Sequence, residues 1–417
     1  MSKHKKKHHS SQSVPALQNR HGRRSYAVGA LVAVILLTVY FILSRPSGAP
    51  EADTRNSTPR PQSASLMRED TSAPAVWIRR AEAIDAHFHD VYTPCWEGAY
   101  GAIGDAYLFA ATHDSSLYRF HLLDHDLKQM CVGRWVDDRA WICLAECIWW
   151  DVTGRTDAQL VQDAAHRYLE ARMEKRFSNV EGFWSWYNWP PGSEAQEQIF
   201  TNSNMNQMVT VACWLYLATG EHRFLQDALL AWNGDGTSPG IEKTWYKGNG
   251  LWVGKPGLAA FGQQVPWEGA GYCSVAAALY RATHDARYRN IALATARRIM
   301  DPKNNWVDPK YFYQLRMDGN GAFVNFLFDA YATAPDSLPD LLPKIRTMLE
   351  HVWTNHDGES VVTLHRESDN GIRNGWNPYG GEDGYNVDEV GTVHAQGEAA
   401  RAFGTFTYYF SRSKSPR

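Results

Sequence analysis

Short helical segments with one hydrophobic pattern recur along the chain from about residue 76. Four of them carry small apolar residues on all sides, then a bulky residue, a threonine and a turn: AIGDAYLFAATHD (102–114), ICLAECIWWDVTGR (142–155), VACWLYLATGE (211–221) and SVAAALYRATHD (274–285). An amphipathic segment follows each one, at 117–130, 157–173, 222–232 and 286–300. Helices that are apolar all round are buried, whereas amphipathic helices lie at the surface. The pattern therefore predicts repeated hairpins of one inner and one outer helix.

Further helical patterns complete the set. Segments 76–92, 319–333, 337–353 and 393–410 bring the number of predicted helices to twelve, and strands are confined to short hairpins in the loops. Six inner and six outer helices form an all-α fold, the (α/α)6 toroid. The sequence thus predicts one toroidal domain over residues 76–412.

Four cysteines occupy equivalent places in this repeat. Cys147 and Cys213 each lie six residues before the threonine of their turn. Cys143 and Cys273 each lie ten residues before theirs. Equivalent positions on equivalent helices indicate buried thiols that pack against a neighbouring helix rather than reactive groups.

The predicted connections differ in length according to their place in the repeat. Turns within a hairpin are short, whereas a long connection joins each outer helix to the next inner helix. The inner helices therefore all begin at one end of the ring, and the long connections gather at that rim. Long structured loops are usually functional. The sequence places the site among connections 174–200, 233–266, 301–318 and 354–392.

Two consecutive carboxylates, Asp137 and Asp138, begin a predicted inner helix at this rim, within GRWVDDRAW (133–141). Aspartate is favoured at helix starts, where it accepts hydrogen bonds from free backbone N–H groups, so a helix cap is one interpretation. Glycoside hydrolysis needs such a pair: an acid for the leaving oxygen, and a nucleophile or base. Two like charges this close raise the pKa of one carboxyl, which suits the acid. We predict that both aspartates are catalytic.

The connections at this rim are rich in aromatic residues. Flat rings can stack on sugars, and neighbouring polar groups can bind hydroxyls, although aromatic residues also fill cores. The candidate substrate-binding residues are Trp135, Trp141, Trp184, Trp186, Asn202, Trp267, Glu268 and Trp376. The mid-helix tryptophans Trp149, Trp150, Trp214 and Trp232 are assigned to the core instead.

Other acids at the rim have simpler interpretations. Glu194, Glu197, Glu382 and Asp383 fit helix caps, hydroxyl ligands or solvated charges. The chain contains no CxxC, HExxH, Walker loop, dinucleotide-binding glycine motif or aspartate-rich calcium loop. We therefore predict no cofactor and no metal.

The N-terminal region has a different character. Residues 1–44 contain seven Lys or Arg and no acid, and 26–44 hold an uncharged stretch long enough to cross a bilayer. We expect a basic cytoplasmic tail (1–25), a signal-anchor transmembrane helix (26–44), a disordered stem (45–75) and an extracytoplasmic domain. A cleaved signal peptide is the alternative.

Charge and cysteines limit the partners of the domain. The chain after residue 44 holds 35 Lys or Arg against 45 Asp or Glu, so an acidic body has no electrostatic reason to bind nucleic acid. A neutral oligosaccharide or polysaccharide suits it better. Cys95 and Cys131 fall in predicted loops and could form a disulfide in an extracytoplasmic compartment.

Three stretches resemble glycoside hydrolase family 76, the endo-α-1,6-mannanases. They are VDDRAWICLAECIWWDVTG (136–154), GFW (182–184) and TNSNMNQMVTVACWLYLATG (201–220), within a similarity that runs over roughly 76–410. The resemblance implies an (α/α)6 barrel that acts with retention on α-1,6-linked mannan, with Asp137 as nucleophile and Asp138 as acid/base. The chain departs from the family at Glu181-Gly182-Phe183-Trp184-Ser185, where the family has Gly-Gly-x-Trp-Trp.

Two alternatives to hydrolysis stay open. Fungal relatives of this family are cell-wall transglycosidases, so a sugar could replace water as acceptor at the same site. A catalytically silent glycan-binding protein is the second alternative, and the intact aspartate pair argues against it. Sugar epimerases and lyases share the toroid, but His351 and His394 have no evident partners in the sequence.

Overall fold

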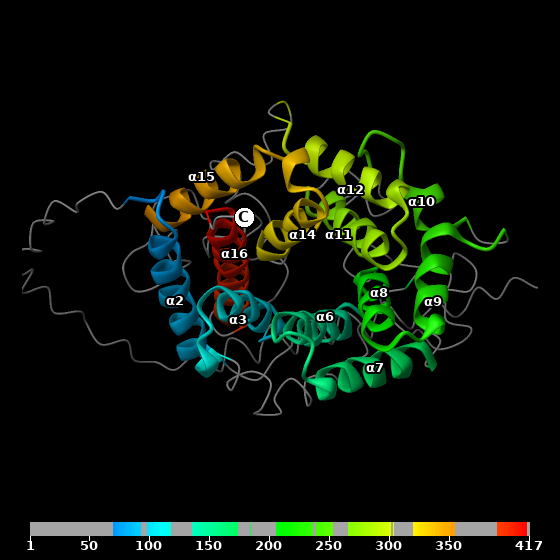
Figure 1. Cartoon of the computed structure of the whole chain (residues 1–417), viewed down its shortest axis with the longest axis horizontal. Coiled ribbons are helices and arrows are strands. Elements are labelled where there is room, and N and C mark those ends of the chain that lie inside the picture. The colour runs from blue at the N-terminus through cyan, green and yellow to red at the C-terminus, as the bar shows by residue number, and fades with distance from the viewer. Residues whose placement is uncertain are drawn as a thin grey trace, which may run out of the picture. The chain divides into compact units, whose positions relative to one another are not determined.

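Helices contact one another in a closed ring in the computed structural model, which describes residues 70–92, 98–117, 136–173, 184, 206–236, 239–252, 266–301, 303, 320–354 and 390–414. Within these residues each inner helix contacts the next, and the last contacts the first (Figure 1). The ring consists of α3 (Gly98–Thr112), α6 (Val136–Val152), α8 (Gln207–Thr219), α11 (Pro266–Thr283), α14 (Asn320–Thr333) and α16 (Val390–Lys414). This closed ring confirms the predicted all-α toroid.

A second set of helices surrounds this ring. α7 lies between α6 and α8, α9 contacts α8 and α11, and α12 contacts α11 and α14. The outer helices are α2 (Pro74–Val91), α7 (Ala158–Met173), α9 (His222–Asn233), α12 (Ala286–Ile299) and α15 (Leu341–Thr354). Each outer helix buries its apolar stripe against the ring, as amphipathic helices do. The predicted outer helix 117–130 falls almost wholly outside the described residues.

The first and last helices close the ring together. Trp77 of α2 is fully buried and packs edge-on against Phe406 of α16, with ring centroids 4.6 Å apart. The hydroxyl of Thr407 donates to the carbonyl oxygen of Trp77 at 3.2 Å, a contact across 330 residues. The two ends of the domain therefore supply one hairpin-like pair, α16 with α2.

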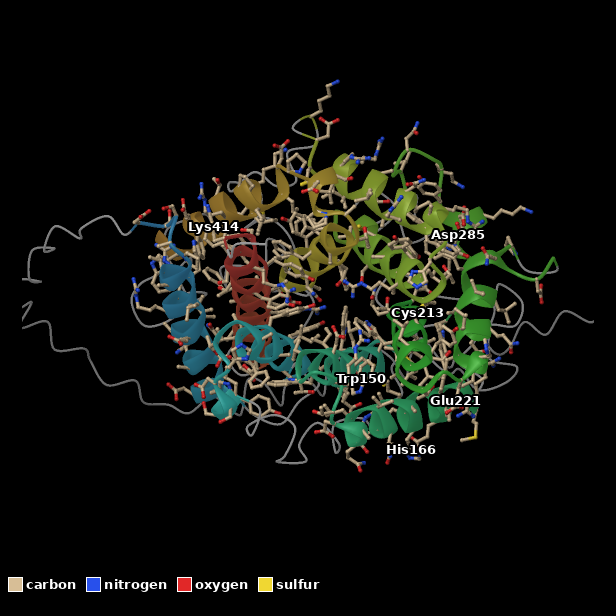
Figure 2. The ribbon with its side chains drawn as sticks, viewed as in Figure 1. Trp150, His166, Cys213, Glu221, Asp285 and Lys414 are labelled. Atoms are coloured by element: carbon tan, nitrogen blue, oxygen red, sulfur yellow. The ribbon has the colours of Figure 1, made fainter. Side chains whose placement is uncertain are left out.

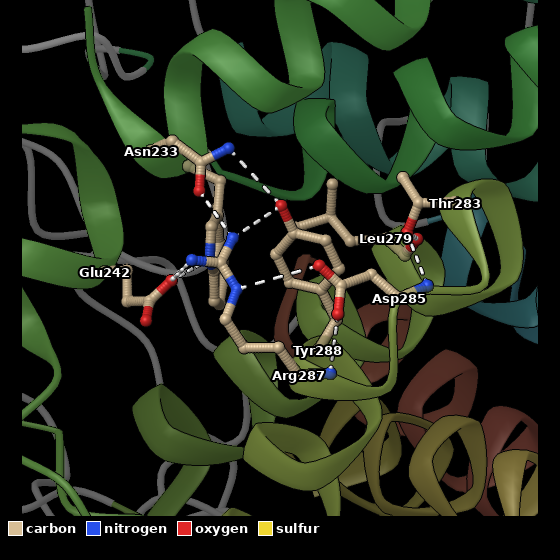
Figure 3. Close-up of polar contacts among 8 residues, drawn as sticks. Asn233, Glu242, Leu279, Thr283, Asp285, Arg287 and Tyr288 are labelled. Atoms are coloured by element: carbon tan, nitrogen blue, oxygen red, sulfur yellow. Dashed lines mark hydrogen bonds and ion pairs between the residues drawn. The ribbon is translucent and has the colours of Figure 1, made fainter.

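The turns from inner to outer helices share one construction. In three hairpins a threonine hydroxyl donates to the carbonyl four residues earlier and accepts the backbone N–H two residues later, as Figure 3 shows for Thr283. A residue with positive φ lies between them, at His113 (61°), Gly220 (71°) and His284 (59°). The hydroxyl-to-carbonyl distances are 2.8 Å for Thr112, 2.7 Å for Thr219 and 2.7 Å for Thr283. Three threonines of the sequence repeat thus end the inner helices α3, α8 and α11.

The predicted burial of the cysteines is confirmed. Cys143, Cys147, Cys213 and Cys273 are all buried, and Figure 2 labels Cys213 on α8. The thiol of Cys143 donates to the carbonyl oxygen of Ala164 on α7 at 3.7 Å, and that of Cys273 donates to Ala292 on α12 at 3.2 Å. Burial raises the pKa of these thiols where a shift is resolved, at Cys147, Cys213 and Cys273. Cys95 and Cys131 lie outside the described residues.

One helix was not expected from the sequence. α10 (Gly240–Trp245) occupies the connection between α9 and α11. Its Glu242 accepts a hydrogen bond from the Trp232 indole at 2.6 Å, and its Ile241 and Trp245 are buried. Six residues are too few for a stable isolated helix, so contacts with α9 hold it in place. Strands were predicted in the loops, and the described residues contain isolated bridges alone, one of which joins Tyr246 to Trp252.

The N-terminal predictions cannot be compared with this structure. The basic tail, the transmembrane helix (26–44) and the stem all lie outside the described residues. Among the helices that are described, none combines the length and the apolar character that crossing a bilayer requires.

Candidate active site at the rim of the helical ring

Asp137 and Asp138 lie in the first turn of α6, as predicted. Both are half-buried, whereas Val136 and Arg139 on either side are buried. The first turn of a helix carries a partial positive charge from its free backbone N–H groups, which stabilises nearby carboxylates. The pair is therefore partly accessible and sits where ionised aspartate is favoured.

The position of this turn in the toroid follows from the connections. Each described turn that leaves an inner helix is short, from Val152 to Ala158, from Thr219 to His222, from Thr283 to Ala286 and from Thr333 to Leu341. Four of the connections that enter inner helices are long, 174–206, 234–265, 300–319 and 355–389, whereas the one that enters α3 spans only 92–97. The start of α6 thus lies at the end of the ring where these long connections enter the inner helices.

Aromatic side chains fill the interior of the helical ring one turn along α6 from the aspartate pair. Trp141, one helical turn after Asp137, is 1% exposed. Its ring stacks on Phe326 of α14 at 5.9 Å and meets Tyr100 of α3 edge-on at 5.3 Å. These three rings hold α3, α6 and α14 together beneath the rim.

A buried cation lies among these rings. The guanidinium carbon of Arg401, on α16, is 5.0 Å from the ring centre of Trp141, 5.3 Å from Phe326 and 5.6 Å from Tyr100. Its Nη2 donates to Oδ1 of Asn325 at 2.7 Å, and its Nη1 is buried without a hydrogen-bond partner among the described residues. Burial lowers the pKa of the guanidinium. Cation–π attraction is strongest where the cation is desolvated, as it is here.

The polar contacts continue deeper into the ring. The Asn325 amide donates to the hydroxyl of Tyr107 at 3.2 Å. One turn further along α14, Asp329 accepts a hydrogen bond from Ser274 at 2.6 Å. Burial raises the pKa of Asp329, and the charge of Arg281 opposes that shift. Arg401, Asn325 and Tyr107 thus form one set of buried polar contacts, and Asp329 with Ser274 forms a second.

The sequence contained one signal for these contacts. Asn325 and Asp329 interrupt the otherwise apolar segment NGAFVNFLFDAYAT (320–333). Buried polar groups need partners, so two polar residues one turn apart on a buried face indicate a network. The identity of their partners, which come from α3, α11 and α16, could not be read from the pattern.

The predicted substrate-binding tryptophans fall into different environments. Trp184 is 1% exposed and packs against Tyr168 at 5.4 Å, while its backbone N–H donates to Oδ1 of Asn206 at 3.4 Å. Trp141 is buried as described above. Their burial favours a packing role, and direct contact with a substrate stays a prediction for both.

The remaining predicted residues are placed only in part. Trp267 and Glu268 lie in the first turn of α11, so their backbone is at the same rim as Asp137. Trp135, Trp186, Asn202 and Trp376 lie outside the described residues, as do the rival acids Glu194, Glu197, Glu382 and Asp383. The mid-helix tryptophans Trp149, Trp150, Trp214 and Trp232 are buried, as predicted.

One cluster of potential metal ligands exists among the described residues. Asp85 and His89 of α2 and Asp105 of α3 bring ligand atoms within 4.8 Å of one another. This cluster lies on α2 and α3, whereas Asp137 and Asp138 lie on α6. No sequence motif indicated it, because its third member lies on a second helix.

Comparison with known proteins shows the fold. No family model matches the chain, and neither does any curated protein. Among solved structures, an inactive variant of the α-1,6-mannanase GH76A of Salegentibacter sp. HEL1_6 with α-1,6-mannotriose has a TM-score of 0.57 and 14% identity, over 79% of this chain and 99% of that chain. The glycoside hydrolase family 76 mannosidase Bt3792 from Bacteroides thetaiotaomicron has a TM-score of 0.54 and 14% identity, over 81% and 100%.

A fungal protein shares the fold too. Dfg5 from Chaetomium thermophilum, in complex with glucosamine, has a TM-score of 0.54 and 11% identity, over 82% of this chain and 92% of that chain. The domain therefore has the fold of the glycoside hydrolase family 76 α-1,6-mannanases, as the sequence resemblance indicated.

Proposed function

We propose that this protein is a retaining glycoside hydrolase of family 76 that cleaves α-1,6-mannan-like polysaccharide. The observation that carries the proposal is the placement of Asp137 and Asp138, half-buried in the first turn of an inner helix at the rim of the long connections. The fold shared with α-1,6-mannanases supports the substrate class.

The pair has the groups that double displacement requires. Asp137 attacks the anomeric carbon while Asp138 protonates the departing glycosidic oxygen, which leaves a glycosyl ester on Asp137. Asp138 then removes a proton from water, which opens the ester with net retention. The partial charge at the helix start favours an ionised nucleophile. Repulsion between neighbouring carboxylates favours one protonated partner.

A neighbour with the same fold supports the role of a consecutive pair. The Salegentibacter α-1,6-mannanase is described as inactive when two consecutive aspartates are replaced by asparagine or by alanine. Those variants were obtained with α-1,6-mannotriose and α-1,6-mannotetrose. By analogy, we assign an α-1,6-linked mannose chain to the rim of this protein.

The test is hydrolysis of linear α-1,6-mannan by the full chain and by Asp137→Asn and Asp138→Asn. General acid–base groups contribute about 100- to 10,000-fold to rate, so Asp138→Asn should lose that much and Asp137→Asn at least as much. Asp151→Asn, near the other end of α6, is the matched control and should retain activity. Wild-type rates in Asp137→Asn, with far-ultraviolet circular dichroism unchanged, would overturn the proposal.

The alternative outcome is transfer to a sugar. It rests on the family resemblance, and the likeness to Dfg5, which was solved with glucosamine, is compatible with it. Incubation with α-1,6-mannan and a labelled oligosaccharide acceptor distinguishes the two: elongated labelled product indicates transglycosylation, whereas reducing ends alone indicate hydrolysis. Binding without either product would instead indicate a silent glycan-binding protein.

We further propose that residues 26–44 anchor the protein with its N-terminus in the cytoplasm. The support is the uncharged stretch and its basic N-terminal flank. Protease treatment of intact cells should remove the domain and leave the tail protected. A domain that resists protease until the cells are lysed would contradict this orientation.

A further inference from the structure

We propose that Asp85, His89 and Asp105 form a structural binding site for a small divalent metal ion, of the Zn²⁺ type, which links α2 to α3. The three side chains converge from two helices, and their ligand atoms lie within 4.8 Å of one another. The site is separate from the proposed catalytic pair, which is on α6.

The spacing of the ligand atoms suits a tetrahedral ion. Nε2 of His89 lies 3.2 Å from Oδ2 of Asp85 and 3.4 Å from Oδ1 of Asp105. Nitrogen and oxygen ligands about 2.1 Å from Zn²⁺ in tetrahedral geometry are roughly 3.4 Å from one another. One imidazole and two carboxylates are ligands that bind divalent ions of the first transition row.

A second observation also indicates a missing ligand. The Asp85 side chain is 7% exposed, and its Oδ1 is buried with no hydrogen-bond partner among the described residues. A buried carboxylate oxygen without a partner is costly. An ion bound by the Asp85 carboxylate, His89 and Asp105 would neutralise this carboxylate and compensate for its burial.

The charges in the cluster are compatible with a cation. Two carboxylates lie close together, and burial and the charge of Asp105 raise the pKa of Asp85. A divalent ion between the two carboxylates would balance their negative charge.

A bound divalent ion, two carboxylates and a neutral imidazole carry no net charge. Ligands must be deprotonated to bind a metal ion, so any protons that they carry are released on binding.

The location gives the site a structural role and an entrance. α2 packs against α3 and α16, so a bound ion would brace the point where the ring closes. The His89 side chain is 15% exposed, so the ion can enter from that side. The other two ligands are more deeply buried.

The test compares the zinc content of the full chain with that of His89→Gln and Asp85→Asn after loading with Zn²⁺ and dialysis. Both variants should hold about one equivalent less than wild type, with affinity at the site lowered at least about 100-fold. His166→Gln is the matched control, because His166 and Glu170 are also four residues apart, but exposed and without a third ligand. The N-terminal HKKKHH stretch contributes equally to every variant, so the difference reports the site.

Thermal unfolding provides the second measurement. A chelator should lower the midpoint of zinc-loaded wild type by several degrees, and it should leave His89→Gln unchanged. Equal zinc content in wild type and His89→Gln, or an equal response to chelator, would overturn the proposal. If His89→Gln does not fold, Asp85→Asn, which keeps the shape of the side chain, decides the outcome by the same two measurements.

Discussion

The guanidinium of Arg401 lies 5.0 Å from the ring centre of Trp141, one turn below Asp137 on α6. The contact joins the last helix of the chain to the helix that carries the proposed catalytic pair. Because Arg401 also donates to Asn325, it links α6, α14 and α16 beneath the rim. The integrity of the site thus depends on a buried cation far from it in sequence.

Replacing Arg401 by lysine should destabilise the domain. Lysine keeps the charge but loses the flat stacking surface and the second donor to Asn325, at a cost of about 1–3 kcal/mol. Arg412→Lys is the matched control on the same helix, since Arg412 lies over Tyr408 at 5.2 Å but at the surface. Its change should stay within about 0.5 kcal/mol. Urea unfolding measures both, and equal midpoints for the two variants would contradict the prediction.

The ion pair between Glu146 and Arg167 should be far more sensitive than a surface pair. Arg167 Nη2 donates to Glu146 Oε1 at 2.7 Å, with both side chains buried between α6 and α7. Glu146→Gln removes the negative charge that compensates the guanidinium and should cost about 3–5 kcal/mol.

The double variant Glu146→Met with Arg167→Met should recover much of that loss, because no buried charge remains. Asp151→Asn breaks the exposed Asp151–Arg155 pair of the same hairpin and should cost less than about 1 kcal/mol. Denaturant midpoints decide the matter: a Glu146→Gln variant as stable as Asp151→Asn would show that the buried pair contributes little.

Because α3 and α16 pack closely at Gly104, the effect of adding a single methyl group there can be predicted. A Cβ on Gly104 would lie 2.5 Å from the carbonyl carbon of Ala400, which is backbone and cannot turn aside. Gly104→Ala should therefore cost about 1–3 kcal/mol. A Cβ on Gly269 meets only Ile299 and Thr295 side chains, the nearest at 3.6 Å, so Gly269→Ala should be neutral or stabilising. Differential scanning calorimetry tests the opposite signs.

The stability of the metal-free chain should fall as the pH rises from about 6.5 to about 10. The unshifted pKa of His89 is 6.5, and the two carboxylates raise it to about 10 in the folded chain. A base with a raised folded pKa contributes stability that is complete below the unfolded value and is lost as the pH passes the folded value. Measurements use chelator-treated protein at several pH values.

His89→Gln should remove most of this pH dependence, whereas His166→Gln should retain it because His166 is exposed on α7 (Figure 2). A wild-type chain with constant stability across this interval would show that His89 is not held in its charged form.

Much of the fold could be predicted from periodicity. The four segments that are apolar on all sides became α3, α6, α8 and α11, and the amphipathic segments 157–173, 222–232 and 286–300 became α7, α9 and α12. The further helical patterns became α2, α14, α15 and α16. The exception within the described residues is α10, whose short sequence has little helical preference and depends on contact with Trp232. A hydrophobic pattern predicts a helix only where the helix is long enough to repeat its apolar face. With six residues, α10 is too short to show such a repeat.

Some features of the candidate site could also be predicted from the sequence, and others could not. The place of Asp137 and Asp138 at a helix start followed from the alternation of inner and outer segments, which makes the inner helices begin at one end of the ring. Sequence alone could not separate a packing role from a substrate-binding role for Trp141 and Trp184, since the exposure of a side chain depends on its neighbours in space. Trp141 lies against Phe326 and Tyr100, which are distant in sequence.

The sequence by itself determined the helical hairpins, their inner and outer faces, the buried thiols and the rim that holds the aspartate pair. Each of these follows from residues within one turn or one hairpin, where sequence spacing translates directly into spatial position. Only the tertiary structure decided what lies beneath the rim and what closes the ring. The Arg401 contacts and the cluster of Asp85, His89 and Asp105 join side chains from different helices. The packing of the helices sets the distances between these side chains, and no local sequence pattern encodes that packing.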